Sequence, residues 1–310
     1  MLPQLIIILG PTASGKTDAG LAVARAVDGE VICADSRTVY REMNIGTAKP
    51  EGSREWGVGS SLELDRPLLV DGIPHWGLDL VDPNQTFTVS EFQAYADKKI
   101  RQIIGRGKQP ILVGGTGLYI RAVIDRPTFA EVPPNPNFRA EIATKSDAEL
   151  LEEISELDPD AASTIDEKNR RRLERTLEIL RGTGKPLAES RSWGEKLYEP
   201  VMIGLDIARE ELYDRLDTRV DIMVAKGLID EVRKLREKYG SDVPGMTGIG
   251  YRQICEFLDA KSTLSNAITR IKIDTRHYAK RQETWFKHDS RITWVKDAKG
   301  AVTEAIRVRS

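Results

Sequence analysis

The stretch GPTASGKT, residues 10 to 17, constrains the fold of this chain more than any other feature. It follows the apolar run LIIIL and precedes DAGLAVARAV, whose apolar spacing predicts a helix. It matches the phosphate-binding pattern G-x-x-x-x-G-K-[ST], which is specific when it joins a strand to a helix. This order predicts a parallel α/β sheet whose first loop binds a diphosphate or a triphosphate.

The first third of the chain alternates strands with helices. Apolar runs at 5–9, 30–34 and 110–114 are rich in β-branched residues, as expected of strands buried on both faces. Helical spacing between these runs predicts helices around 16–27 and 90–105. Residues 52–90 contain scattered Gly, Pro and Trp, and they predict no firm element before a helix that starts near Ser90.

The second part of the chain begins with a linker. The segment DRPTFAEVPPNPNF, which starts at residue 125, holds four of the fifteen prolines. The pattern is helical from about 137 to 192, and VMIGLDI at 201–207 then predicts a strand that returns to the sheet. We therefore expect a P-loop NTPase-like parallel sheet core built from 1–124 and 200–310 with C-terminal helices, and an inserted all-helical domain at 125–199.

The charge of the chain is nearly balanced. Lys and Arg number 46 and Asp and Glu number 48, so the net charge of -2 excludes a global attraction to nucleic acid or membrane. A basic surface must therefore be local. The strongest local excess lies at 270–291, with seven Lys or Arg against three acids. It falls on a long helix that we expect to run from a Ser262 N-cap to about Lys287, with Tyr278 and Trp285 on its apolar stripe.

The two cysteines indicate a reducing compartment, and the hydropathy bears on a signal peptide or a membrane span. Cys33 and Cys255 are far apart and lack metal-ligand spacing, so we expect neither a disulfide nor a zinc site. The first residues lack the basic region of a signal peptide, and no apolar run reaches the length of a membrane span. We expect a cytoplasmic protein.

The chemistry around the loop separates several classes of enzyme. ATP and GTP hydrolases and small-molecule kinases usually carry an acidic residue at a neighbouring strand end, but PILVGGTG has none. The carboxylate at a strand end is instead Asp35, directly after VICA. Because the carboxyl ends of parallel strands share one crevice, Asp35 should lie near the bound phosphates. It could act as a general base on an acceptor, or as a helix N-cap or a metal ligand.

Seven motifs give the chain a specific resemblance. In order they are GPTASGKT, DSRTVYREMNIGTAKP (35–50), LVDPNQTFTVSEF (80–92), GGTGLYIRAV (114–123), RRLERTLEI (171–179), GIGYRQ (248–253) and DTRHYAKRQETWFK (274–287). Together they resemble the tRNA dimethylallyltransferases, the IPP transferase family, from the first strand to about Trp294. The departure from the family pattern is the Gly- and Trp-containing stretch at 52–74, which touches no chemical residue.

The resemblance implies that the loop holds the diphosphate of dimethylallyl diphosphate as a leaving group. The implied reaction transfers the dimethylallyl group to N6 of the adenosine 3′ of the anticodon in tRNA. Asp35 would be the base, Lys16 and Arg215 would offset the charge of the diphosphate, and Thr17 would hold Mg²⁺. Arg219 lies one turn beyond Arg215. The implied diphosphate-binding residues are Gly10, Pro11, Thr12, Ala13, Ser14, Gly15, Lys16 and Thr17.

The resemblance also implies a set of tRNA contacts. They are Asp35, Ser36, Arg37, Thr38, Thr116, Arg139, Arg171, Arg172, Leu173, Glu174, Arg175, Thr247, Gly248, Ile249, Gly250, Tyr251 and Arg252. On an ideal helix Arg171 and Arg175 lie opposite Leu173 and Leu177, so they should face solvent or a phosphate backbone. The target base must leave its stack to reach Asp35.

Two alternatives stay open at this point. A P-loop kinase could use Asp35 as a base on a hydroxyl, and a nucleotide-gated RNA-binding protein would need no base and would tolerate Asp35→Asn. The three histidines, His75, His277 and His288, are expected to be structural or surface groups. The expected partners are tRNA, through its anticodon stem-loop, and dimethylallyl diphosphate. We expect a monomer that does not bind a membrane.

Overall fold

The computed structural model describes residues 2–54, 66–128, 132–133, 135–190 and 192–308. The chain divides into two compact units. Unit 1 comprises Met1–Ile124 and Leu197–Ser310, and unit 2 comprises Asp125–Lys196. Within the described residues, no helix is both long and apolar enough to cross a membrane.

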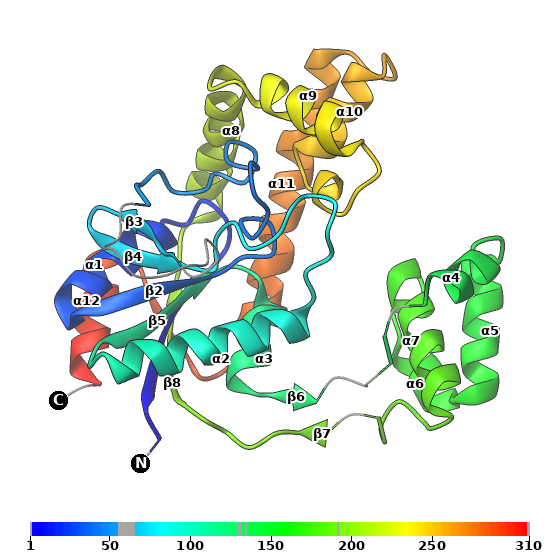
Figure 1. Ribbon diagram of the computed structural model, residues 1–310, viewed down its shortest axis with the longest axis horizontal. Coiled ribbons are helices and arrows are strands. Elements are labelled where there is room, and N and C mark those ends of the chain that lie inside the picture. Colours follow the sequence, from blue (N-terminus) through cyan, green and yellow to red (C-terminus); the bar gives the residue numbers. More distant parts are fainter. Residues whose placement is uncertain (1, 55–65, 129–131, 134, 191, 309–310) are drawn as a thin grey trace. The chain divides into compact units, whose positions relative to one another are not determined.

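Unit 1 is an α/β structure built on a seven-stranded sheet in the order β3-β4-β2-β5-β1-β8-β9 (Figure 1). All neighbouring strands are parallel except β3 and β4. The strands are β1 (Gln4–Leu9), β2 (Gly29–Ala34), β3 (Leu68–Val70), β4 (Ile73–Trp76), β5 (Gln109–Gly114), β8 (Glu199–Leu205) and β9 (Ile292–Val295). The helices are α1 (Lys16–Val27), α2 (Val89–Gly105), α3 (Gly117–Ile124), α8 (Arg209–Ala225), α9 (Leu228–Tyr239), α10 (Tyr251–Leu258), α11 (Leu264–Lys287) and α12 (Ala298–Arg307), with a 3₁₀ turn at Gly245–Thr247.

The sheet is covered on both faces because successive side chains of a strand point to opposite sides. In β1, Ile6 and Ile8 belong to the core beneath α1 and α12, whereas Leu5, Ile7 and Leu9 belong to the core beneath α2 and α3. Every β1 side chain from Leu5 to Leu9 is fully buried. The sheet therefore holds the loop after β1 on a rigid base.

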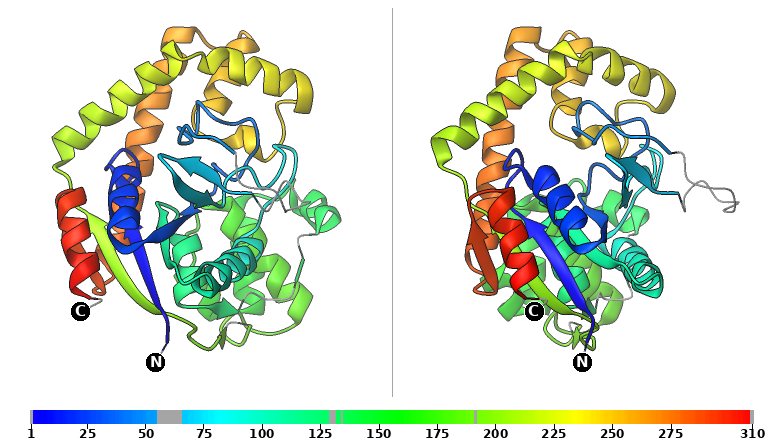
Figure 2. Two further views of the ribbon diagram at one scale, coloured as in Figure 1. Left: turned by 60° about the vertical axis from the view of Figure 1, so that its left-hand side comes forward. Right: turned by 90° about the vertical axis from the view of Figure 1, so that its left-hand side faces the viewer.

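A separate cluster of helices in unit 1 lies beyond the sheet. Helices α8, α9, α10 and α11 share an apolar core with residues 39–43, in which Val39 and Met43 are fully buried. Figure 2 shows these helices extending past the sheet. Helix α11 is the longest of them by its bounds. This cluster forms a wall beside the loops that follow β1, β2 and β5.

The structure corrects several sequence predictions for unit 1. The sheet is mixed, because β3 and β4 form an antiparallel hairpin within the stretch expected to be irregular. Strand β9 was not anticipated, because the chain after 207 was expected to be helical. The long helix begins after Thr263, whose side chain accepts from Asn266 N, and not after Ser262. Trp285 is 39% exposed and so lies outside the apolar stripe, which instead buries Ala279 and Phe286.

Unit 2 is mainly helical, but the prediction of an all-helical domain was wrong. Its helices are α4 (Pro136–Ile142), α5 (Asp147–Leu157), α6 (Pro159–Thr164) and α7 (Arg170–Thr183). The short strands β6 (Pro127–Thr128) and β7 (Ser192–Trp193) pair antiparallel where the chain enters and leaves the unit. A strand of only two residues has no hydrophobic periodicity that sequence analysis could detect. Residues 197–199 belong to unit 1, where Tyr198 is buried in the core.

Candidate active site

The phosphate loop is formed by local backbone conformation. It joins β1 to α1, with positive φ at Gly10, Ala13 and Gly15. Lys16 Nζ donates to Pro11 O at 2.5 Å, so the lysine folds back over the loop. Ser14 Oγ is buried and has no hydrogen-bond partner in the described chain. A buried hydroxyl without a partner fits a loop that binds an oxygen-rich ligand.

Asp35 lies directly after β2 and is oriented by its own turn. Its Oδ1 accepts from Arg37 N at 2.7 Å and from Thr38 N at 3.3 Å. No other hydrogen bond to the carboxylate is recorded within the described residues, so Oδ2 is available for a ligand. Thr38 Oγ1, on the same turn, is also buried without a partner in this part of the chain. The Asp35 turn thus offers acceptor and hydroxyl groups that its own fold does not use.

Three charged side chains influence one another at this point. Burial, and next the charge of Arg219, lower the pKa of Lys16 to about 7, while the charge of Asp35 acts in the opposite direction. Burial also lowers the pKa of Arg219, and Asp35 partly offsets that effect. Two cations and one carboxylate are therefore close together in a poorly solvated space, which is suited to an anionic ligand.

Of Arg215 and Arg219 on helix α8, Arg219 lies at the site and Arg215 does not. Arg215 is exposed and pairs with Glu211 on its own helix at 2.6 Å. Arg219 lines the cleft and donates to Thr47 O at 3.4 Å, and no carboxylate of the described chain forms an ion pair with it. The structure thus places Arg219 at the cleft, whereas the sequence analysis favoured Arg215, one helical turn before it.

A cleft of about 480 Å³ is lined by Thr12, Asp35 and Arg219 but not by Lys16, and we call it the Asp35 cleft. Its walls are Thr12 of the phosphate loop, the Asp35 turn, residues 46–47, helices α8 and α11, and the start of α10 with the loop before it. Of the residues expected to contact tRNA, the cleft is lined by Asp35, Ser36, Arg37, Thr247, Ile249, Gly250 and Arg252. Thr116 adjoins it, since Thr116 Oγ1 accepts from Ser36 N at 3.1 Å.

Tyr251, also expected to contact tRNA, lies in the core. Its side chain is 1% exposed and its hydroxyl donates to Glu231 Oε1 at 2.7 Å. Its ring packs so closely on Gly46 that a Cβ at that position would lie 2.5 Å from a ring carbon. Tyr251 therefore supports the cleft from behind and does not line it.

Sequence analysis did not anticipate the role of Glu231. Its carboxylate accepts from the backbone N–H groups of Asn44, Ile45 and Gly46 at 2.8 to 3.0 Å. Glu231 lies on α9, and three N–H groups converging on one carboxylate fix the backbone that leads to Thr47. No sequence signal links position 231 to position 45, because the contact is tertiary.

The arginines predicted for unit 2 differ in their surroundings. Arg139 and Arg175 both donate to Glu178, whose side chain is 1% exposed. Arg175 also donates to Val132 O at 2.8 Å, so it stabilises unit 2 from within. Leu173 is fully buried and Glu174 pairs with Arg170, whereas Arg171 and Arg172 are exposed. Of the two arginines expected to face solvent or a phosphate backbone, Arg171 is exposed and Arg175 is held by an ion pair. The exposed arginines here are Arg171 and its neighbour Arg172.

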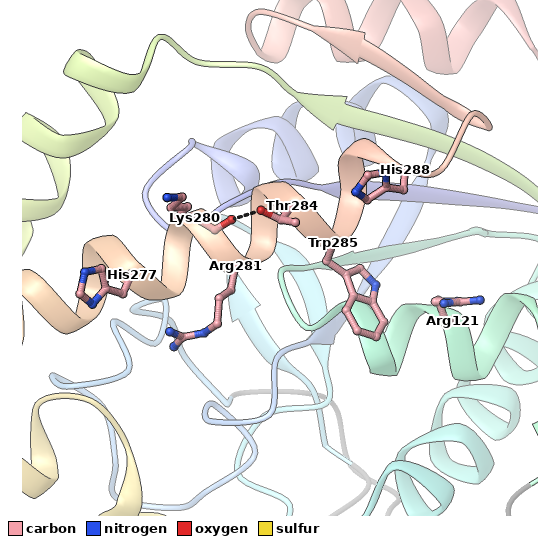
Figure 3. Close-up of a pocket in the computed structure, with 7 residues that line it drawn as sticks. All are labelled: Arg121, His277, Lys280, Arg281, Thr284, Trp285 and His288. Atoms are coloured by element: carbon pink, nitrogen blue, oxygen red, sulfur yellow. Dashed lines mark hydrogen bonds between the residues drawn. The ribbon is translucent and has the colours of Figure 1, made fainter. Parts of the chain in front are cut away.

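The basic stretch of α11 is also reduced by ion pairs. Carboxylates pair with Arg270, Lys272, Arg276 and Arg291. A second pocket of about 670 Å³ lies along the same helix (Figure 3). Its lining residues are Arg121 on α3 and His277, Lys280, Arg281, Thr284, Trp285 and His288 on or next to α11. Arg281 also lines the Asp35 cleft, so the two hollows share one cation.

The surroundings of the cysteines and histidines complete the description of the predicted site residues. No group of three or more His, Cys, Asp or Glu in the described chain is arranged to hold a metal. Both cysteines are free thiols, as expected. His75 is 3% exposed and burial lowers its pKa, which fits a structural group. His277 and His288 line the second pocket.

Comparisons with known proteins agree on one family. The sequence model of IPP transferase matches residues 38–289. A tRNA dimethylallyltransferase from Symbiobacterium thermophilum is 39% identical over 97% of this chain and 93% of its own. One from Halalkalibacterium halodurans is 40% identical over 95% and 91%.

Solved structures give the same result. A full-length tRNA isopentenylpyrophosphate transferase from Bacillus halodurans is 37% identical, with a TM-score of 0.67 over 99% of both chains. A eukaryotic dimethylallyltransferase acting on tRNA is 27% identical, with a TM-score of 0.76 over 99% of this chain and 77% of its own.

Proposed function

The chain belongs to the IPP transferase family and catalyses dimethylallyl transfer to tRNA, forming N6-dimethylallyladenosine, and we propose that this reaction takes place in the Asp35 cleft. The donor would be dimethylallyl diphosphate, and the acceptor N6 of the adenosine 3′ of the anticodon. The single observation that carries the proposal is the convergence of Lys16, Arg219 and Asp35. The enzyme would use a P-loop NTPase-like core to hold a leaving group, and neither ATP nor a hydrolytic water enters the reaction.

The phosphate loop and Arg219 would bind the diphosphate of the donor. Breaking the allylic C–O bond builds negative charge on the diphosphate, and the loop N–H groups, Lys16 and Arg219 would offset it. We propose Arg219 in the role that the family resemblance suggested for Arg215, because Arg219 lines the cleft and Arg215 does not. No carboxylate of the described residues forms a direct ion pair with Arg219, although the charge of Asp35 acts on it.

Thr17 would hold Mg²⁺ together with diphosphate oxygens. Mg²⁺ binds hard oxygen ligands, keeps several waters and commonly uses one or two protein groups with substrate phosphates. The set of oxygen donors at this site, the Thr17 hydroxyl and the diphosphate, fits that preference. When bound, the ion would neutralise part of the charge on the leaving group.

Asp35 would be the general base. N6 of adenine is a weak nucleophile because its lone pair is drawn into the ring, so removal of its proton helps the attack. The bond from N6 to the allylic carbon forms as the carbon–oxygen bond breaks, the N6 proton moves to Asp35, and diphosphate leaves with the bonding electrons. Arg37 N and Thr38 N hold Oδ1, so Oδ2 is the atom that we expect to accept the proton.

The acceptor side of the cleft would hold the flipped adenine and its neighbours. Ser36, Arg37, Thr247 and Arg252 line it, and their hydroxyl, guanidinium and backbone groups suit base edges and phosphates. We propose that unit 2 adds phosphate contacts through the exposed Arg171 and Arg172. Every group assigned to the chemistry comes from one chain, which suits a monomer, and an enzyme acting on tRNA would work in the cytoplasm.

The test is mass spectrometry of tRNA incubated with the protein and dimethylallyl diphosphate. Wild-type protein should add one five-carbon unit to adenosine, and Asp35→Asn should lower the single-turnover rate by about 10²-fold or more, the scale of a lost general base. Both proteins should bind tRNA with affinities within a few-fold of each other. A near-wild-type rate in Asp35→Asn would remove Asp35 from the mechanism.

A further inference from the structure

Gln282 is a buried polar side chain that the chemistry described above does not use. It lies on α11 and is 5% exposed. Its Oε1 accepts from Thr12 N, in the phosphate loop, at 2.8 Å. Its Nε2 donates to Gly115 O, in the loop after β5, at 2.8 Å. One amide thus joins two loops that lie more than 100 residues apart in sequence.

The fit around this amide is tight and leaves one orientation. The partner of Oε1 is a backbone N–H and the partner of Nε2 is a backbone carbonyl, so an exchanged amide would break both bonds. Gly115 has no side chain at the place where the amide lies. A Cβ there would be 2.2 Å from Gln282 Nε2. Neither a larger residue at 115 nor an apolar one at 282 preserves the link.

The link continues from Gly115 to the Asp35 turn. The next residue, Thr116, donates its N–H to Ala34 O at 3.2 Å, at the end of β2. Its Oγ1 accepts from Ser36 N at 3.1 Å. Hydrogen bonds therefore run from the phosphate loop through Gln282 and Thr116 to both residues that flank Asp35.

We infer that Gln282 is a positioning residue that fixes the phosphate loop relative to the Asp35 turn. This inference rests on the proposed function, in which the loop holds the leaving group and Asp35 takes the proton. In a displacement at carbon the nucleophile, the carbon and the leaving group must lie in line, and a misplacement of about 1 Å can cost about 10²-fold in rate. Gln282 touches neither substrate in this account and acts only through the two loops.

Kinetic constants distinguish positioning from a general structural role. Gln282→Met keeps most of the side-chain volume but loses both hydrogen bonds. With both substrates saturating, we expect its single-turnover rate to fall at least about tenfold, with affinities for dimethylallyl diphosphate and tRNA within about threefold of wild type. The matched control is Gln109→Met. Gln109 Nε2 bonds backbone carbonyls at the opposite end of β5, and this variant should react at the wild-type rate.

A second variant breaks the same link from the other side. Gly115→Ala should displace the Gln282 amide and lower the single-turnover rate, whereas the control Gln109→Met should keep the wild-type rate. If both substitutions act through one link, the double variant should be no slower than the slower single variant. Multiplied losses in the double variant would overturn the inference, and so would a rate for Gln282→Met within twofold of wild type. A fall in rate that saturating donor restores would also overturn it.

Folding and the proposed function are tested separately. If Gln282→Met does not fold, Gln282→Glu replaces it. That variant keeps the length and the acceptor for Thr12 N but loses the donor to Gly115 O, so a wild-type rate in it would overturn the inference. Asp35→Asn is measured alongside. A slow Asp35→Asn with a normal Gln282→Met overturns only the positioning role, whereas a normal Asp35→Asn overturns the proposed site itself.

Discussion

The phosphate loop and the opposite wall of the Asp35 cleft are built in different ways. The loop is eight consecutive residues whose shape follows from local backbone conformation and from the strand and helix beside it. The wall is assembled from residues 46–47, α8, the loop before α10, and α11, which only the folded chain brings together. A contiguous motif therefore supplies most of the donor site, to which the wall adds Arg219, whereas the acceptor surface depends wholly on tertiary contacts.

The largest expected effect is on kcat, and it comes from Arg219, the wall residue that would bind the donor diphosphate. Arg219→Ala removes a half-buried cation whose charge acts on Lys16, and we expect kcat to fall by about 10²–10³-fold, the scale of one lost charge-stabilising donor. Arg215→Ala is the matched control one turn away, and it should stay within about threefold because Arg215 already pairs with Glu211. Steady-state kinetics with saturating donor and tRNA measure both. Equal losses would mean that the position of Arg219 in the cleft is irrelevant.

Glu231 tests whether the wall depends on tertiary contacts. Glu231→Gln leaves one oxygen for the N–H groups of Asn44, Ile45 and Gly46 and for the Tyr251 hydroxyl. Loss of charged, partly buried hydrogen bonds should lower the free energy of unfolding by about 1–3 kcal/mol. Denaturant unfolding measures this loss. The affinity for tRNA should fall with it, while the affinity for the donor should not.

An equal fall in donor affinity in Glu231→Gln would contradict the separation of loop and wall. Glu237→Gln, at an exposed position on the same helix, is the control and should change neither quantity.

The lowered pKa of Lys16 predicts how donor binding depends on pH. In the donor-free protein this pKa is about 7, so above it the lysine is increasingly neutral. An anionic donor favours the charged form, and its affinity should fall by up to about tenfold for each pH unit above 7. Binding at pH 8 should take up close to one proton, measurable by calorimetry in buffers of different ionisation enthalpy. Proton uptake at pH 8 no larger than the small uptake expected at pH 6 would contradict the environment described for Lys16.

Lys16 also affects stability, with a definite sign. Its folded pKa is lowered from 10.5, so between about pH 7 and 10.5 the unfolded chain binds more protons than the folded one. The free energy of unfolding of the donor-free protein should therefore gain a contribution that rises with pH across this interval. Lys16→Met should lack that rise.

The smallest effect concerns unit 2. Arg171→Ala should weaken tRNA binding by about 0.5–1.5 kcal/mol and reduce its salt dependence, because one exposed phosphate contact is lost. Arg175→Ala should instead destabilise unit 2, since it breaks bonds to Glu178 and Val132. Binding at several salt concentrations and thermal unfolding distinguish the two. Identical behaviour of the two variants would contradict the different surroundings that the structure gives them.

The sequence predicts local features well. The phosphate loop, its flanking strand and helix, and Asp35 at the end of β2 all follow from contiguous patterns. The hairpin of β3 and β4 was missed although Asp71 and Gly72, both at positive φ, form a dipeptide typical of hairpin turns. Residues 55–65, part of the stretch that departs from the family pattern, lie outside the described residues.

Features that depend on which helix face is buried were not predictable. Arg215 and Arg219 are four residues apart and lie on one face of an ideal helix, so spacing cannot tell which of them reaches the cleft. Tyr251 sits within a motif that resembles a tRNA contact, but its ring is needed to pack on Gly46. Gln282 resembles any polar helix residue until its two backbone partners are known.

The separation of the two sites is tested most directly by the binding of tRNA to Lys16→Ala. This substitution removes the charge in the phosphate loop and leaves the cleft wall intact. Filter binding without donor should give an affinity for tRNA within about threefold of wild type, while turnover falls by about 10²-fold or more. A loss of tRNA affinity as large as the loss of turnover would show that the loop and the wall are not separate sites, contrary to this account.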